Sequence, residues 1–454
     1  MRDLPVLSGL LDQGPLALPG GTLPWLSRRR AEAAERFRAH GLPNRRLEAW
    51  KYTDLPRALK DREYLPAQRQ EPVSLDAVPA LIAEAPLARL VFVDGLYRAE
   101  LSATAGLPEG VRLLSLAQAL EREPALLEGR LGALTEGDGG DDPQQSLLAL
   151  NAALLDDGLV LLVEPGVVVP GRIELVQLGG LSERPVFHCP RHLVVLGAGA
   201  RATLVERIQG LGPTGSLANA VTEIDLGAGA SLVHLRLQEA GAEAVELATT
   251  RGSLAADARY EGFSLTLGAA LSRHELLFAL VGEGAHIALN GAYLLRGTQH
   301  GDTTTRIEHR VPNTSASETY KGALDDAARA VFQGMILVER DAQKTDGRML
   351  NKTLLLSDKA EIDSKPELEI YADDVQCAHG ATAGEIDADA LFYLRSRGLD
   401  GRQARALLIE AFLAEAIETL SDEALHVPLL ARVRAWLQVA SEKQQGASGG
   451  EAGR

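Results

Sequence analysis

The sequence has little cysteine, few aromatic residues and a deficit of positive charge. Its two cysteines exclude a disulfide framework and are typical of the reducing cytoplasm, where we expect the chain to lie. Lysine and arginine number 46 against 62 aspartate and glutamate residues, which gives a net charge of −16. That balance argues against a nucleic-acid binder, because such proteins gather cations to displace phosphate counterions.

Several kinds of segment and motif are also missing from the sequence. No apolar run approaches the roughly 20 residues of a membrane helix, and no basic region leads into an apolar core at the N-terminus. We therefore expect no membrane span and no secretory signal. The sequence contains no Walker A motif, no Rossmann fingerprint after a strand, no His-Glu-x-x-His and no Gly-x-Ser-x-Gly, so we expect no nucleotide site of its own.

Glycine, in contrast, is abundant, with 45 residues. From about residue 157, short Val/Leu-rich runs alternate with Gly, Asn and Asp. The motif Gly-x-Gly-Ala recurs at 197–200, 227–230 and 282–285. These motifs lack the third glycine of a phosphate-binding loop, and we interpret them as turns. Repeated strand–turn–strand units without long helices predict the stacked coils of a parallel β-helix. A pair of β-sandwiches is the alternative.

Helical patterns flank this predicted β-helix. Residues 22–41 predict a helix that ends at Gly41, and Asp387 is placed to cap another. A further helix carries one apolar stripe, made of Ile409, Leu413, Ala416, Ile417 and Leu420. The chain is thus divided into an N-terminal helical region (1–85), a mixed α/β connection (86–150), the β-helix (151–385), a C-terminal helical domain (386–440) and a disordered tail (441–454).

Cys377 and His379 form the pair of residues with the clearest chemical potential. In an extended segment both side chains point to one face, within reach of a single metal ion. Structural zinc requires four protein ligands and catalytic zinc about three, so Cys-x-His is half of a site. Cys189, with His188 and His192 beside it, is a possible further contributor. A free cysteine is also often a small buried apolar residue, which is the alternative for both cysteines.

Other polar residues are predicted near the same end of the β-helix. They are Lys365, Glu367, Glu369, Asp373 and Asp374 just before the cysteine, and His300, His309 and Lys321 in the preceding coils. Glu367 and Glu369 alternate with apolar residues, which is the ordinary pattern of a strand with one solvated face. Taken together, these residues favour a polar site completed by another subunit.

The block SKPELEIYADDVQCAHGATAG, followed by LFYLRSRGL and an Ala/Arg-rich helix, resembles the SufB/SufD family of iron–sulfur cluster assembly scaffolds. The resemblance extends over nearly the whole chain, because it also includes RRLEAWKYTDL, LNAALLDDGLVL (150–161) and the block at 331–366. Two features favour the SufD branch of the family. One is the motif LEAWKYTDL, and the other is Gly380 after His379, where SufB usually has glutamate. Ala378 departs from the serine usual there, and the cysteine-rich N-terminal motif of many SufB proteins is absent.

The resemblance implies a right-handed parallel β-helix with helical domains at both ends, and a non-catalytic, cytoplasmic scaffold subunit. Such a subunit pairs with SufB through the β-helices and binds one copy of the ATPase SufC through its C-terminal helices. The SufBCD complex builds a transient cluster from iron and from sulfur supplied by a cysteine desulfurase with its transfer partner. Neither nucleic acid nor membrane is implied as a partner, an isolated chain is able to form a homodimer, and binding of reduced flavin to the complex stays open.

The resemblance also assigns residues. His379 is the interface histidine, acting with a SufB cysteine, and Cys377 matches a family cysteine whose role is less settled. We expect SufC contacts on the helix after the β-helix, at Leu391, Phe392, Tyr393 and Arg395. ATP-driven closure of two SufC copies would then pull on the C-terminal helices and open the interface. Two alternatives remain: a β-helix carbohydrate-active enzyme, and a homodimeric SufB-like scaffold.

Overall fold

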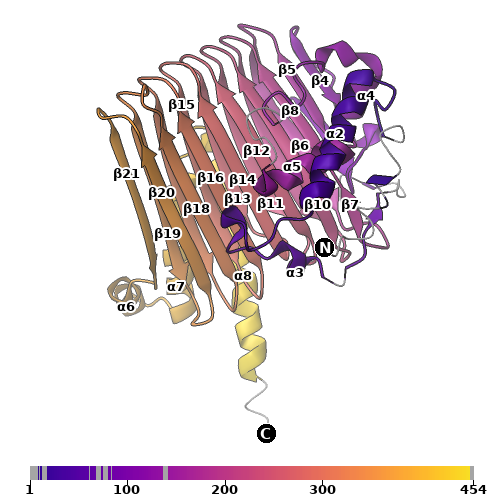
Figure 1. Ribbon diagram of the computed structural model, residues 1–454. Coiled ribbons are helices and arrows are strands. Elements are labelled where there is room, and N and C mark those ends of the chain that lie inside the picture. Colours follow the sequence, from indigo (N-terminus) through magenta and orange to yellow (C-terminus); the bar gives the residue numbers. More distant parts are fainter. Residues whose placement is uncertain are drawn as a thin grey trace.

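Two long β-sheets, stacked face to face as successive coils of one solenoid, form most of the chain (Figure 1). The computed structural model describes residues 9, 11–12, 18–60, 62–67, 73–74, 80–82, 84–135 and 142–449, with side chains to residue 438. Sheet A contains β1 (Leu65–Pro66), β4 (Val111–Ser115), β5 (Leu159–Val163), β7 (Val186–His188), β8 (Arg191–Leu196), β10 (Ser216–Leu226), β12 (Val245–Leu254), β14 (Leu271–Leu280), β16 (His300–His309), β18 (Arg329–Val338) and β20 (Glu361–Ile370). Sheet B contains β2 (Ala88–Val93), β3 (Leu96–Tyr97), β6 (Val168–Gly179), β9 (Arg201–Gly210), β11 (Ser231–Glu239), β13 (Arg259–Thr266), β15 (His286–Leu295), β17 (Ser315–Leu324), β19 (Asp346–Leu355) and β21 (Gln376–Gly384).

From β8 on the strands alternate between the sheets, so each strand from β10 on pairs with the strand two places before it in the sequence. β14, for example, lies between β12 and β16, and β15 lies between β13 and β17. Among the ladders of the described strands, only β2–β3 and β4–β5 are antiparallel. This topology confirms the predicted parallel β-helix. The β-sandwich alternative is wrong, because sandwich sheets are built from antiparallel strands.

The Gly-x-Gly-Ala motifs form turns between strands of the solenoid, as predicted. Gly199, Gly229 and Gly284 have φ of 70°, 67° and 74°, a left-handed conformation that a side chain disfavours. The turns stack, because the Gly199 amide donates to the Ala228 carbonyl at 2.8 Å. Glycine is therefore required where one tight turn lies directly on the next.

Side chains that point into the solenoid form ladders, one rung per coil. One ladder in sheet A runs Leu226, Leu254, Leu280, His309, Val338 and Ile370 in exact register. Its rungs are fully buried from Leu226 to Val338, whereas Ile370, in the last coil, is 39% exposed. Fully burying one such aliphatic side chain is worth about 1.5–3 kcal/mol. Stacking of coils thus provides the stabilisation, and the last coil lacks it on one side.

Helices and short 3-10 turns precede, interrupt and follow the strands. They are α2 (Pro24–His40), η2 (Glu48–Trp50), α3 (Leu55–Ala58), η4 (Ala99–Leu101), α4 (Leu116–Arg122), η5 (Pro124–Leu126), η6 (Pro143–Gln145), α5 (Ser146–Leu154), α6 (Ala388–Ser396), α7 (Gly401–Ile417), η7 (Glu423–Leu425) and α8 (His426–Gly449). The predicted helix at 22–41 corresponds to α2, and Asp387 caps α6 by accepting from the amides of Asp389 and Ala390. No helix within the described ranges is long and apolar enough to cross a membrane.

The N-terminal segment is bound to sheet A by a buried charge cluster. The Arg273 guanidinium lies 4.0 Å from the centre of the Trp50 ring and donates to the backbone carbonyl of Ala49 at 2.8 Å. The same guanidinium pairs with the buried carboxylate of Asp302, which also accepts from the Thr53 hydroxyl. The motif LEAWKYTDL therefore owes its residue types to this contact with β14 and β16.

The C-terminal helices lie on sheet B, where α7 packs on β15 and β17. The predicted stripe of Ile409, Leu413, Ala416, Ile417 and Leu420 is buried against Leu235, Phe263 and Leu294 of the sheet. Buried Lys321 on β17 pairs with Glu415 of α7. The backbone of α8 continues to Gly449, so residues 441–449 of the expected tail are helical, and residues 450–454 lie outside the described residues.

Replacing Asp302 tests the buried cluster. Asp302→Ala removes one carboxylate partner of the buried Arg273 guanidinium. We therefore expect the free energy of unfolding, measured by urea titration, to fall by about 3–5 kcal/mol. Asp363→Ala is the matched control, because its pair with Arg329 is about one third exposed and is expected to contribute within about 1 kcal/mol. Equal effects of the two substitutions would contradict the assignment.

Candidate functional site: the open end of the solenoid

The last coil of the solenoid has no coil above it. β20 pairs only with β18, and β21 pairs only with β19, among the described strands. The outer edges of both strands thus present unpaired backbone groups at one end of the molecule (Figure 1). Ile370 and Tyr371, at the end of β20, are 39% and 64% exposed. Such an edge is a surface on which another chain can continue the sheets.

Cys377 and His379 lie on β21 with their side chains on one face, as predicted. In the ladder with β19, Cys377 is opposite Gly347 and His379 is opposite Met349. Met349 is buried in the core between the sheets, so both side chains belong to rows that point inward. Because no further coil follows, His379 is exposed and Cys377 is half-buried. The two donor side chains therefore stand at the mouth of the solenoid.

The thiol of Cys377 is held in its protonated form. Partial burial raises the pKa of this thiol above its ordinary value, the Gly347 backbone partly offsets that rise, and the charge of Asp346 adds to it. Iron is bound by the thiolate, so binding must release this proton. A cation approaching from a partner would favour that release.

The donor set at this end is small. Thiolate and imidazole are ligands that suit iron. No group of three or more His, Cys, Asp or Glu side chains in the described part of the chain is placed to hold one metal ion. Cys377 and His379 thus lie on one face of β21, as the sequence predicts, in a position that a second chain can reach.

The other polar residues predicted near this end do not join the pair. His300 is on the outer face of sheet A, where its Nε2 lies 2.9 Å from the Thr53 hydroxyl. Lys321 lies on the outer face of sheet B under α7, and His309 points inward and contacts the Thr314 hydroxyl at 2.7 Å. The expectation that these three gather with Cys377 and His379 is wrong, because neighbouring strands belong to opposite sheets and alternate residues face opposite sides.

The acidic residues just before the cysteine are divided in the same way. Glu367 and Glu369 face outward while Leu368 packs against the core, which confirms the solvated strand face. Lys365 Nζ donates to Glu48 at 2.7 Å and so connects the N-terminal segment to β20. Asp374, in the turn before β21, pairs with Lys344 at 3.5 Å.

Cys189 is also excluded from the site. It is fully buried beneath the N-terminal helices, beside β8. Six strand spacings, about 29 Å, separate β8 from β20. Burial raises the pKa of the Cys189 thiol and lowers that of both His188 and His192 to about 4. Cys189 is the small buried residue of the alternative interpretation, and its histidine neighbours are neutral core residues.

The expected SufC contacts lie together on α6. Phe392 and Tyr393 are 74% and 57% exposed, Arg395 is exposed, and Leu391 is half-buried. Only residues 385–387 separate α6 from β21. Sequence reasoning missed Ile370 and Tyr371, although a large aromatic side chain at a coil end after an alternating strand is a signal that could have shown them.

The fold and its open end define a two-sheet parallel β-solenoid whose last coil carries a paired thiol and imidazole. Known families match this description. The model "SUF system FeS cluster assembly, SufBD core domain" matches residues 180–412, and the model "SufBD protein N-terminal region" matches residues 10–175.

Individual relatives agree with the family models. The iron–sulfur cluster assembly protein SufD of Escherichia coli is 35% identical over 87% of this chain and 89% of its own length. A SufBD family protein of Synechocystis is 34% identical over 87% of each chain, and SufD of Bacillus subtilis is 28% identical over 64% of this chain and 67% of its own. The chain belongs to the SufBD family of iron–sulfur cluster assembly proteins, and the predicted likeness to its SufD branch is confirmed.

The reactivity of Cys377 tests the electrostatics of the site. In a Cys189→Ala variant, the rate of alkylation by iodoacetamide should rise with pH with a midpoint above that of an exposed cysteine in a short peptide measured alongside, because burial disfavours the thiolate. The measurement is a pH–rate profile of the isolated chain. A midpoint at or below that of the peptide would show that the thiol is already activated without a partner.

Proposed function

We propose that the chain is a scaffold subunit of a SufBCD-type complex, with no turnover of its own. It pairs through the open end of its solenoid with a SufB-like partner, and it anchors one copy of a SufC-like ATPase on α6 and its neighbouring helices. The nascent cluster, or its iron, is the cargo that the two scaffold chains hold between them for a short time. The observation that carries this proposal is the placement of Cys377 and His379 at an uncapped coil.

Pairing at the open end is supported by three features of the last coil. Its strand edges have unpaired backbone groups, its apolar residues Ile370 and Tyr371 are exposed, and its ligand pair is incomplete. A partner coil would cover the apolar residues and extend both sheets. It would also bring further thiolate or imidazole ligands to His379. Cys377 then serves as a second ligand once its proton is lost.

Docking of the ATPase is supported by the exposed aromatic surface of α6. Phe392 and Tyr393 are large and solvent-exposed, and Arg395 is next to them on the same helix. Aromatic and arginine side chains are the residue types that contribute most to protein interfaces. Leu391, on the same helix, is half-buried.

A mechanical connection between the two sites follows from the short linker at 385–387. A pull on α6 reaches β21 directly, because the linker has little slack. α7 resists that pull, since Lys321 and Glu415 bind it to β17. ATP-driven closure of two SufC copies would therefore move β21 relative to sheet B and open or close the shared site. Cluster release is coupled to the ATPase by this route.

His379→Ala tests the shared site. We expect the complex with SufB and SufC to assemble normally but to form at least about tenfold less cluster, because an interface ligand is lost. Cluster is measured by iron and acid-labile sulfide and by visible absorption, and assembly by gel filtration. His40→Ala, at the end of α2, is the matched control and should form cluster as the unchanged chain does. Unaltered cluster formation by an intact His379→Ala complex would refute the assignment.

Phe392→Ala tests the ATPase surface. We expect SufC binding to weaken by about 2 kcal/mol or more, as for a central aromatic residue of an interface, while the β-helix stays folded. Val168→Ala is the control, since Val168 is 57% exposed but lies on β6, outside the C-terminal helices. Affinities are measured by calorimetry with purified SufC. Equal affinities for the two variants would place the ATPase elsewhere.

A further inference from the structure

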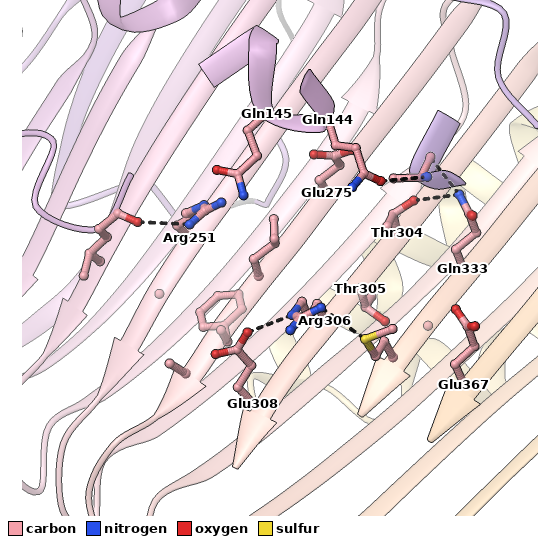
Figure 2. Close-up of a pocket in the computed structure, with 18 of the residues that line it drawn as sticks. Gln144, Gln145, Arg251, Glu275, Thr304, Thr305, Arg306, Glu308, Gln333 and Glu367 are labelled. Atoms are coloured by element: carbon pink, nitrogen blue, oxygen red, sulfur yellow. Dashed lines mark hydrogen bonds and ion pairs between the residues drawn. The ribbon is translucent and has the colours of Figure 1, made fainter. Parts of the chain in front are cut away.

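A cleft lies on the outer face of sheet A (Figure 2). Its lining includes neither Cys377 nor His379. Its volume is about 820 Å³, within the range of small-molecule sites. Strands β12 to β20 form the floor. The roof consists of segments distant in sequence, at 48–49, 133–134 and 142–145.

The floor is a row of residues in register across five strands: Arg251, Leu277, Arg306, Met335 and Glu367. Four strand spacings make this row about 19 Å long. Leu277 and Met335 are half-buried and apolar, and they stand between the charged positions. The cleft can therefore accept the apolar body of a ligand together with a charged group.

Most charges around the cleft are paired with a charge of opposite sign, and the exceptions among the described lining residues are Asp142, which accepts from the Gln144 amide, and one arginine. Arg306 and Arg310 both bond to Glu308, each at 2.7 Å, and Lys365 bonds to Glu48. Glu275 is paired with Arg273, and Glu367 with Lys365. Every glutamate of the lining thus has a cationic partner.

Arg251 is the one cation of the described lining without an ion pair. Its one hydrogen bond within the described residues is a long one, from a terminal guanidinium nitrogen to the Leu134 carbonyl at 3.4 Å, and its Nε is buried without a partner. Burial lowers the pKa of Arg251, and the nearest carboxylates, including those of Glu275 and Glu308, offset this only partly. Figure 2 shows Gln145 extending from the roof toward Arg251. A partly desolvated guanidinium that forms no ion pair with a carboxylate of the described residues is a site prepared for an anion.

We propose that this cleft binds a small organic anion, with its carboxylate or phosphate group on Arg251 and an apolar body over Leu277. The guanidinium provides charge and directed donors, and the amide of Gln145 is placed to supply a further hydrogen bond. The Arg251 end of this cleft lies four strand spacings from β20, the edge strand of the open end, and contains neither Cys377 nor His379. It requires neither a SufB-like partner nor a cluster.

Calorimetric titration of the isolated chain with benzoate, phenyl phosphate and benzyl alcohol tests the proposal. We expect saturable one-to-one binding of at least one of the two anions and much weaker binding of the neutral alcohol. The better anion identifies the head group. In Arg251→Met the affinity should fall about tenfold or more, because a charged hydrogen bond is lost while the alkyl stem remains. Arg251→Lys should retain part of it.

Arg201→Met is the matched control, since Arg201 is exposed on sheet B and does not line the cleft. It should bind the anions as the unchanged chain does. Circular dichroism confirms that each variant is folded, and Arg251→Gln replaces Arg251→Met if the latter does not fold. Absence of anion binding, equal binding of the alcohol, or unchanged affinity without the Arg251 charge would each overturn the proposal. The titrations contain no iron, sulfide or partner, so their result is independent of the scaffold function.

Discussion

The structure depends on the register of the parallel ladders, which requires every inward side chain to have a coil on each side. Where that condition is met, as from Leu226 to Val338, the rungs are fully buried. It fails at the last coil, where Ile370 is partly exposed and His379 is solvent-accessible. A solenoid must end somewhere, and natural solenoids cap their ends or use them. This chain places its paired thiol and imidazole at the uncapped end.

The helical regions have complementary roles around this constraint. The N-terminal segment covers sheet A through Trp50, Arg273 and Asp302, and it reaches the last coil through the pair of Glu48 and Lys365. The C-terminal helices cover sheet B and are held by Lys321. Both outer faces are therefore occupied over much of their length, while the edges of β20 and β21 stay open. The same N-terminal segment also roofs the cleft that contains Arg251, so one covering element serves stability and creates a second concave surface.

Features that depend on neighbouring residues could be predicted from the sequence. The turns at Gly199 and Gly229, the cap at Asp387 and the common face of Cys377 and His379 all follow from local spacing and strand periodicity. The sequence could not show that His300, His309 and Lys321 lie apart from that pair. Which sheet a strand joins, and which side of the sheet a residue faces, depend on the exact length of each coil. The cleft could not be predicted for a related reason, because its roof at 48–49 and its floor at Arg251 are far apart in sequence. Nothing local indicates that Arg251, unlike Arg306, forms no ion pair within the part of the chain that the structure describes.

The most direct test of the central claim compares how much iron and acid-labile sulfide is bound by the isolated chain and by its complex with SufB-like and SufC-like partners. Both samples are reconstituted anaerobically under the same conditions. A site completed by a second scaffold chain predicts little stable binding by the chain alone and a stoichiometric cluster in the complex. A cluster held equally well by the isolated chain, as a homodimeric scaffold would hold it, would contradict the account.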